Sequence, residues 1–194
     1  YGTEKFKSDL TESKTLVKYG VSDYYLIVGR FVPENNYELL IRSFMESKTT
    51  RDLVIITNYE GNPYYEELRA QTGFDKDPRI KFVGTVYDQN ELRYIREQAF
   101  AYLHGHEVGG TNPGLLEAMW STPVNIVLGV NFNRTTAEDA VIYFDKENLR
   151  TVLSEVELMS SDTRHRLKYK ARAIIEEKYT WDHICAQYET LFIK

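Results

Sequence analysis

Short runs of apolar residues, each the length of a β-strand, alternate along this chain with longer amphipathic runs of helical periodicity. Such alternation is typical of α/β proteins that contain a parallel sheet. Right-handed crossovers between the strands then place helices on both faces of the sheet. The pattern therefore predicts a Rossmann-like, doubly wound parallel sheet of about six strands. The predicted strands are residues 24–28, 53–57, 79–83, 99–103, 124–128 and 141–144.

The predicted helices fill the intervals between the strands and the end of the chain. Asp88-Gln89-Asn90-Glu91 has the pattern of a capping box that opens a helix with Leu92 and Ile95 inward. The other predicted helices are a run containing Leu39, Leu40 and Phe44, and residues 63–72, 115–120, 148–159, 162–178 and 181–192. In the last of these, one stripe holds Trp181, Ile184, Tyr188 and Leu191.

One glycine-rich turn stands out for its chemistry. The stretch from His104 to Met119, HGHEVGGTNPGLLEAM, follows a predicted buried strand and opens a helix. Gly109 and Gly110 let the backbone approach a ligand closely, and Asn112 is a good N-cap for a helix that begins at Pro113. The backbone N–H groups and the helix dipole at such a start stabilise an anion. We therefore predict a phosphate site at this turn.

Glu117 lies one turn into that helix and suggests a second kind of contact. A carboxylate repels phosphate, but it accepts hydrogen bonds from a pair of hydroxyls, such as those of a ribose or a hexose. A phosphate beside a sugar indicates a nucleotide-sugar ligand. The alternative interpretation is an ordinary strand-to-helix turn in which Glu117 is simply solvated.

The spacing resembles that of the retaining glycosyltransferases of the GT-B fold, family 4 type. Their motif E-G-F-G-x-x-x-x-E-A-M is matched here in its second half by residues 116–119 and by Pro123-Val124. The first half departs from the motif, because Gly109 stands eight positions before Glu117, where the family has a glutamate. The variant H-G-H-x-V-G-G-T-N-P-x-L-L-E-A-M resembles the branch of bacterial surface-polysaccharide rhamnosyltransferases.

A second segment carries the same resemblance. Gly29 and Arg30 follow the first strand where the family has G-R-L-x-x-x-K-G, whose two cations hold the donor diphosphate. Arg30 is in place, and Asn35 replaces the lysine, which weakens that contact unless its amide donates instead. The alternative for Arg30 is an ordinary surface arginine at a strand end. The resemblance implies donor binding by Gly29, Arg30, Asn35, Val86, Tyr87, His104, Gly109, Gly110, Thr111, Asn112, Leu116 and Glu117.

Some of these roles leave alternatives open. Val86 and Tyr87 belong to a loop, 84–87, that contacts the nucleotide base in the family or is an ordinary connection. His104 is either a donor to the sugar or phosphate or a satisfied core residue. Residues 132–134 resemble a loop near the donor sugar, but Thr135 stands where glutamate usually follows.

The resemblance implies a domain organisation for the 194 residues. Residues 1–20 are expected to be a linker from a preceding N-terminal domain, 21–178 the nucleotide-sugar-binding domain, and 179–194 a helix crossing back to that preceding domain. The chain is then the donor-binding half of a transferase and inactive alone. Arg30 would stabilise the leaving diphosphate, while the catalytic base and the acceptor site would lie in the other half.

The transferred sugar is expected to be L-rhamnose from dTDP-rhamnose, added with retention to a bacterial surface polysaccharide on a glycan or lipid-linked acceptor. The alternatives are a hexosyltransferase using a UDP- or GDP-sugar, and a non-catalytic nucleotide- or glycan-binding module. An oxidoreductase is disfavoured, since no G-x-G-x-x-G follows the first strand.

Composition and local sequence limit the ligands and partners that we expect and the cellular compartment in which the protein works. The net charge of −5 argues against nucleic acid. No metal or other cofactor is expected, because Asp75-Lys76-Asp77 fits a solvated turn and because His104 and His106, as alternate residues of an extended chain, should point to opposite sides. A single cysteine, Cys185, fits a reducing cytoplasm. The basic stretch 164–172 is either a solvated helix face or a peripheral contact with the inner face of the plasma membrane.

Overall fold

The structure is a computed structural model that describes residues 1–192, with side chains described through residue 190. Its six strands form one parallel sheet in the order β3-β2-β1-β4-β5-β6. This confirms the predicted Rossmann-like α/β fold. The strands are β1 Tyr24–Val28, β2 Asp52–Ile56, β3 Ile80–Gly84, β4 Ala101–His104, β5 Asn125–Leu128 and β6 Ile142–Phe144.

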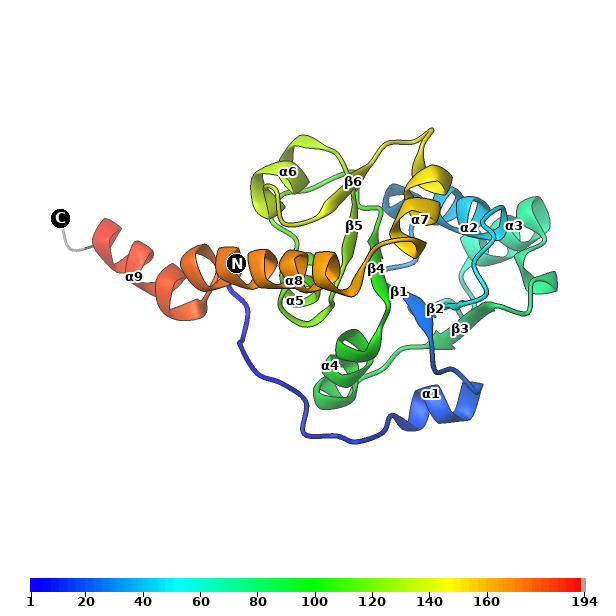
Figure 1. Cartoon of the computed structure of the whole chain (residues 1–194), viewed down its shortest axis with the longest axis horizontal. Helices are drawn as coiled ribbons and strands as arrows, with labels where there is room; N and C mark the ends of the chain where they lie inside the picture. Colours follow the sequence, from blue (N-terminus) through cyan, green and yellow to red (C-terminus); the bar gives the residue numbers. More distant parts are fainter. Residues whose placement is uncertain (193–194) are drawn as a thin grey trace.

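Helices connect the strands and extend beyond the last one (Figure 1). They are α1 Lys14–Tyr19, α2 Tyr37–Met45, α3 Pro63–Thr72, α4 Gln89–Gln98, α5 Pro113–Ser121, α6 Asn131–Ala137, α7 Leu149–Glu157, α8 Ser161–Lys178 and α9 Trp181–Phe192. Short 3-10 turns occur at Pro33–Asn35 and Phe74–Lys76. Helix α6 corrects the expectation of a loop at 132–134. Its buried residues include the polar Asn133 and Thr136, so it shows no apolar stripe in the sequence.

Both faces of the sheet are covered, as a parallel sheet requires. On one face, side chains such as Tyr25 and Ile27 pack against α2, α3 and α7. On the other face, Tyr24 and Leu26 pack with α1 and α4. Helices α5 and α8 close the remainder of that second face in a third apolar cluster that includes Val127. Figure 1 shows these helices on opposite sides of the strands.

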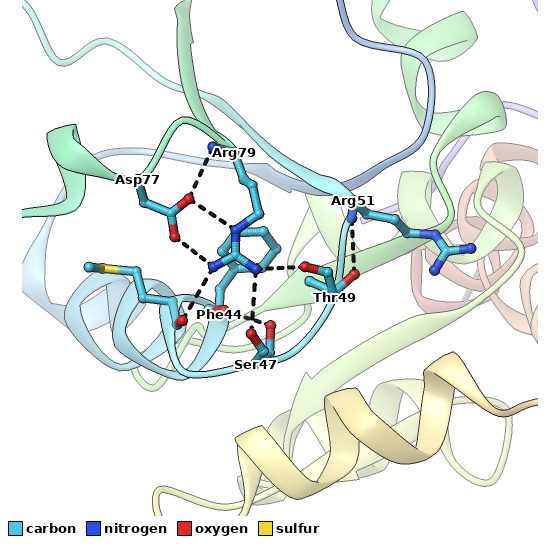
Figure 2. A network of polar contacts seen from close by, with 7 residues as sticks. Phe44, Ser47, Thr49, Arg51, Asp77 and Arg79 are labelled. Carbon is cyan, nitrogen blue, oxygen red and sulfur yellow. Dashed lines mark hydrogen bonds and ion pairs between the residues drawn. The ribbon is translucent and has the colours of Figure 1, made fainter.

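A polar network fixes the edge of the sheet where the strands begin (Figure 2). The Arg79 guanidinium lies over the Phe44 ring at 4.8 Å and donates to the backbone oxygens of Thr49 (2.7 Å) and Met45 (3.2 Å). It also pairs with Asp77 at 2.6 Å, and that pairing lowers the pKa of the Asp77 carboxyl. Asp77 is therefore a structural ion-pair partner, which corrects the expectation that it lies in a solvated turn.

The N-terminal segment lies along the domain and makes specific contacts with it. The Thr3 amide donates to Tyr179 O at 2.7 Å, and the Trp120 indole donates to Phe6 O at 3.2 Å. Glu91 accepts from the Ser13 hydroxyl at 2.6 Å, so it does not complete the capping box that the sequence predicts. Asp88 is the N-cap, as expected. Residues in the segment 1–20 thus contact this domain, and the role of that segment as a linker from a preceding N-terminal domain stays a prediction.

Helix α9 extends away from the body of the domain (Figure 1). On the predicted stripe, Trp181 is 48% exposed and Tyr188 is 60% exposed. The Leu191 side chain lies outside the described residues, as do residues 193–194 of the segment 179–194 that the sequence predicts as a crossover helix. Among the residues that the structure describes, no helix combines the length and the apolar character needed to span a membrane.

Candidate functional site

The strand order creates a crevice between β1 and β4. These two strands are neighbours, but the helix that follows β1 lies on one face of the sheet and the helix that follows β4 lies on the other. In open α/β sheets, ligands bind at this switch point, beyond the carboxyl ends of the strands. The loops that border the crevice are residues 29–36 and 105–112.

The glycine turn and the start of α5 have the predicted form. Asn112 is the N-cap of α5, its side chain accepts from the Leu115 amide at 3.3 Å, and Pro113 is the first helical residue. Gly109 has φ +136°, a conformation that favours glycine. A Cβ added at Gly109 or Gly110 would meet none of the described atoms within 4 Å, so the turn is open on that side. Thr111, the residue before the N-cap of α5, is partly exposed.

The two loops of the crevice are packed tightly against each other at Gly105. A Cβ at Gly105 would lie 2.4 Å from the Asn35 carbonyl oxygen. The Asn36 amide donates to Gly105 O at 2.8 Å, and the Glu107 backbone amide donates to Glu34 O at 3.0 Å. This closeness requires glycine at position 105 and holds the two loops against each other.

Replacing Gly105 by alanine should therefore destabilise the domain. The added methyl collides with a backbone atom, and overpacking of this kind costs about 1–3 kcal/mol of unfolding free energy. Chemical denaturation measures the loss. Gly110→Ala is the matched control, since it adds the same methyl to open space and needs no positive φ. Equal stability of the two variants would contradict the tight contact between the loops.

Arg30 and Asn35 occupy different places in the β1 loop. Arg30 is exposed at the end of β1, as expected for a residue that meets a ligand. Asn35 is only 6% exposed, and its side-chain amide donates to Arg30 O at 2.7 Å. Asn35 thus shapes the backbone of the loop that presents Arg30, while its contact with a diphosphate stays a prediction.

His104 and His106 lie together, which corrects the expectation that they point to opposite sides. Their rings are stacked with centroids 4.4 Å apart and an interplanar angle of 8°. Strand β4 ends at His104, so Gly105 breaks the alternation that holds within a strand. Sequence reasoning did not select His106. Burial lowers the pKa of His104 well below its usual range, and burial together with Arg30 lowers the pKa of His106 to about 4.

His104 fits neither of its two predicted roles fully. The ring is 1% exposed, and within the described part of the chain neither ring nitrogen has a hydrogen-bond partner. It is therefore a core histidine, but not a satisfied one. The backbone around the pair is held from α6, where the Asn133 amide donates to His106 O at 3.1 Å and to Leu128 O at 2.9 Å.

Glu117 is paired with an arginine that sequence reasoning missed. Its Oε2 lies 2.6 Å from Nη2 of Arg96, whose side chain is 4% exposed against 41% for Glu117. Glu117 is thus not merely solvated. Both residues line a cavity of about 430 Å³ whose walls include Pro113, Trp120 and Trp181. The apolar periodicity of α4 gives no signal for a buried arginine, so only the structure reveals this pair.

The remaining predicted residues divide between core and surface. Leu116 is fully buried in the apolar cluster that α5 forms with α8, so its side chain packs in the core and does not face the crevice. Val86 is buried against β1 and α4, whereas Tyr87 is 85% exposed. Any contact of Leu116 or Val86 with a ligand would have to come from backbone atoms. Among the described residues, no three His, Cys, Asp or Glu side chains lie close enough to hold a metal ion.

Comparisons with known proteins support the same architecture. No family model and no curated protein matches this chain. Among solved structures, sucrose-phosphate synthase from Thermosynechococcus elongatus superposes with a TM-score of 0.80 at 17% identity, over 98% of this chain and 50% of that protein. The C-terminal domain of the group 1 glycosyl transferase LpcC from Francisella tularensis gives 0.72 at 15% identity, over 93% of this chain and 100% of that domain. Anabaena HepE in complex with UDP gives 0.76 at 17% identity.

This chain has the fold of a GT-B C-terminal domain. Its agreement with the whole LpcC domain and with half of the sucrose-phosphate synthase identifies which part of the GT-B architecture it represents. The chain spans about half the length of the sucrose-phosphate synthase and of HepE. At these identities the likeness defines the fold alone.

Proposed function

We propose that this chain is the donor-binding domain of a retaining glycosyltransferase that holds a nucleotide-sugar in the β1–β4 crevice. The observation that carries the proposal is the open Gly109–Gly110 turn at the capped start of α5, with Arg30 exposed after the end of the neighbouring strand β1. Two structures of similar fold are described with related ligands: HepE with the nucleoside diphosphate UDP, and the E. coli trehalose-6-phosphate protein with UDP-2-fluoro glucose.

Residues of the two loops and of α5 have separate roles in this proposal. The backbone amides at Thr111 and Asn112, at the positive end of the α5 dipole, bind one phosphate. Arg30 binds the other phosphate and stabilises the charge that develops on the diphosphate as the sugar leaves. Glu117 accepts from the free hydroxyl of the nucleoside sugar with the oxygen that Arg96 leaves free, and in a dTDP donor, whose deoxyribose lacks a 2′-hydroxyl, that group is the 3′-hydroxyl. Transfer itself needs an acceptor site and a base, which we place in another domain.

The proposed donor is dTDP-L-rhamnose, and the proposed product is a bacterial surface polysaccharide. Gly109 puts neither a carboxylate nor bulk on the sugar side of the crevice, and its backbone is free to approach the ligand. A 6-deoxy sugar presents a methyl group and fewer hydroxyls, which suits a site with fewer side-chain acceptors. In this proposal the domain uses no metal and works in the cytoplasm, with a glycan or lipid-linked acceptor at the inner face of the membrane.

Calorimetric titration of this chain with dTDP, UDP and GDP tests donor binding. We expect weak binding of at least one of them and no sugar transfer by this chain alone. NAD is the control ligand, because it shares the diphosphate but belongs to a different reaction class. Binding of NAD with no response to the three nucleoside diphosphates would reject the transferase proposal.

A donor screen with the complete enzyme then decides the sugar. We expect turnover of dTDP-L-rhamnose, and turnover of UDP-glucose or GDP-mannose in its place would make the enzyme a hexosyltransferase. Binding without turnover of any donor by the complete enzyme would favour a non-catalytic nucleotide- or glycan-binding module.

A further inference from the structure

The stacked His104–His106 pair lies where β4 ends, beside the end of β1, and carries unused hydrogen-bonding capacity. A Cβ on Gly29, at the end of β1, would be 3.3 Å from Cε1 of His106, so this ring reaches across from β4 to β1. His104 lies beneath it, with its ring centroid 5.9 Å from that of Tyr102. Both His104 nitrogens are buried without a partner among the described residues. Burying unpaired polar atoms is costly, so the arrangement needs a compensating role.

The charged groups around the pair favour an anionic ligand. Arg30, from the β1 loop, is close enough for its charge to act on His106. Glu107 follows His106, but its carboxylate is held by Lys146 at 2.6 Å and by the Asn36 amide at 3.1 Å. Tyr102 and Tyr37 direct their hydroxyls to the backbone oxygens of Val28 and Gly29 at 3.0 and 3.1 Å. From α6, Arg134 Nε donates to Gly129 O at 2.9 Å.

We propose that the His104–His106 pair takes up one proton when the diphosphate of a nucleotide-sugar binds beside Arg30, and that the imidazolium formed donates a hydrogen bond to that diphosphate. The proton comes from the solvent, and no covalent bond changes. This inference rests on the proposed function, because it takes the donor diphosphate as the ligand. It adds His106 to the residues that bind the donor.

The physical cause of the proton uptake is that the bound diphosphate changes the charge beside the histidine pair from positive to negative. In the free domain, burial and the positive charge of Arg30 both disfavour an imidazolium, so the pair is neutral at physiological pH. A bound diphosphate brings two negative charges, which neutralise Arg30 and favour a second cation close by. Asn35, from the same loop as Arg30, supplies no cation, and its amide is engaged with Arg30 O. Because the rings are in contact, the proton belongs to the pair as a unit.

The sign of the pH dependence follows from this linkage. The pKa of the pair is higher in the bound domain than in the free domain, so binding is strongest below the bound value and weakens as pH rises through it. Between the two values, uptake of one proton changes the affinity by about tenfold per pH unit. Since the pKa of His106 in the free domain is about 4, the dependence extends upward from that pH.

Calorimetry of this chain with dTDP-L-rhamnose and with UDP-glucose, in two buffers of different ionisation enthalpy, counts the protons taken up. Both probes contain a diphosphate diester, which has no ionisation near neutral pH, so any proton taken up enters the protein. Titrations between pH 5 and pH 7.5 should show an uptake that approaches one proton at the maximum. The affinity should fall with rising pH over the same range.

Two variants and a control test whether the proton uptake belongs to the His104–His106 pair. His106→Gln should abolish the proton uptake and flatten the pH dependence, while the half-buried position tolerates an amide. His104→Gln tests the buried member of the pair, and its fold is checked by circular dichroism. His165→Gln, on the exposed face of α8, should leave the uptake unchanged.

Binding of either probe without proton uptake, or uptake that persists in both His106→Gln and a folded His104→Gln, would overturn the proposal. Such a result would leave the proposed function intact, because the donor still binds. Absence of binding by either probe and by the nucleoside diphosphates would reject the proposed function and this inference together.

Discussion

Replacing Glu117 by glutamine should lower the free energy of unfolding of the domain by about 1–3 kcal/mol, the cost of leaving a buried polar group without its partner. The reason is Arg96, whose side chain is 4% exposed and whose Nη2 lies 2.6 Å from the Glu117 carboxylate. Arg96 Nε already has no partner among the described residues. Removing the carboxylate charge therefore leaves a buried cation unbalanced. Denaturation by urea, with and without the substitution, measures the effect.

Matched substitutions separate the loss of this pair from the loss of any carboxylate. Glu66→Gln in α3 removes a carboxylate whose partner, Arg69, is 48% exposed, and it should change stability by less than about 1 kcal/mol. The double variant Arg96→Met/Glu117→Gln removes both partners and should recover much of the stability, since an apolar side chain suits the buried position. A loss for Glu117→Gln no larger than for Glu66→Gln would show that Arg96 does not depend on Glu117.

The same variant tests the proposed contact with the ligand. Arg96 engages Oε2 of Glu117, which leaves the other oxygen for hydroxyl groups. Loss of the carboxylate should weaken binding of thymidine and of dTDP by similar factors, because both ligands contain the sugar. An effect on dTDP alone would instead place Glu117 near the phosphates.

Most of the fold could be predicted from the pattern of apolar and polar residues along the sequence. Strand β1 agrees with its predicted bounds, and the other strands differ from theirs by one or two residues at their ends. These elements were predictable because their burial is apolar and periodic, as in the alternation of Tyr24 and Tyr25 between two faces of the sheet. Helix α6 was not predictable in the same way, because two of its three buried residues are polar and carry no hydrophobic signal.

The candidate site was predictable where local chemistry determines it. The N-cap at Asn112, the proline at the first helical position and the open glycine turn follow from residue types alone. The pairing of Arg96, the stacking of His106 and the contacts of Asn133 could not be found this way. Each of these residues acquires its role from contacts between segments distant in the sequence, such as the approach of the His106 ring to Gly29 at the end of β1.

Replacing Arg30 by alanine should weaken binding of dTDP far more than binding of thymidine. Arg30 is exposed directly after the end of β1, in the loop 29–36. A hydrogen bond from a charged donor to a phosphate contributes about 1.5–3 kcal/mol, which corresponds to a loss of roughly 10- to 150-fold in affinity. Thymidine lacks the phosphates, so its affinity should change little.

Calorimetric titration of both ligands against the Arg30→Ala domain measures this difference, with Arg69→Ala on the distant helix α3 as the control for loss of an exposed arginine. Loss of Arg30 also removes the positive charge that helps to keep His106 neutral, so the pair should protonate more readily in the free domain. Proton uptake on binding should therefore shrink as the affinity for the diphosphate falls. Equal losses for dTDP and thymidine would contradict the diphosphate role, because an effect shared by both ligands must act on the nucleoside or on the fold.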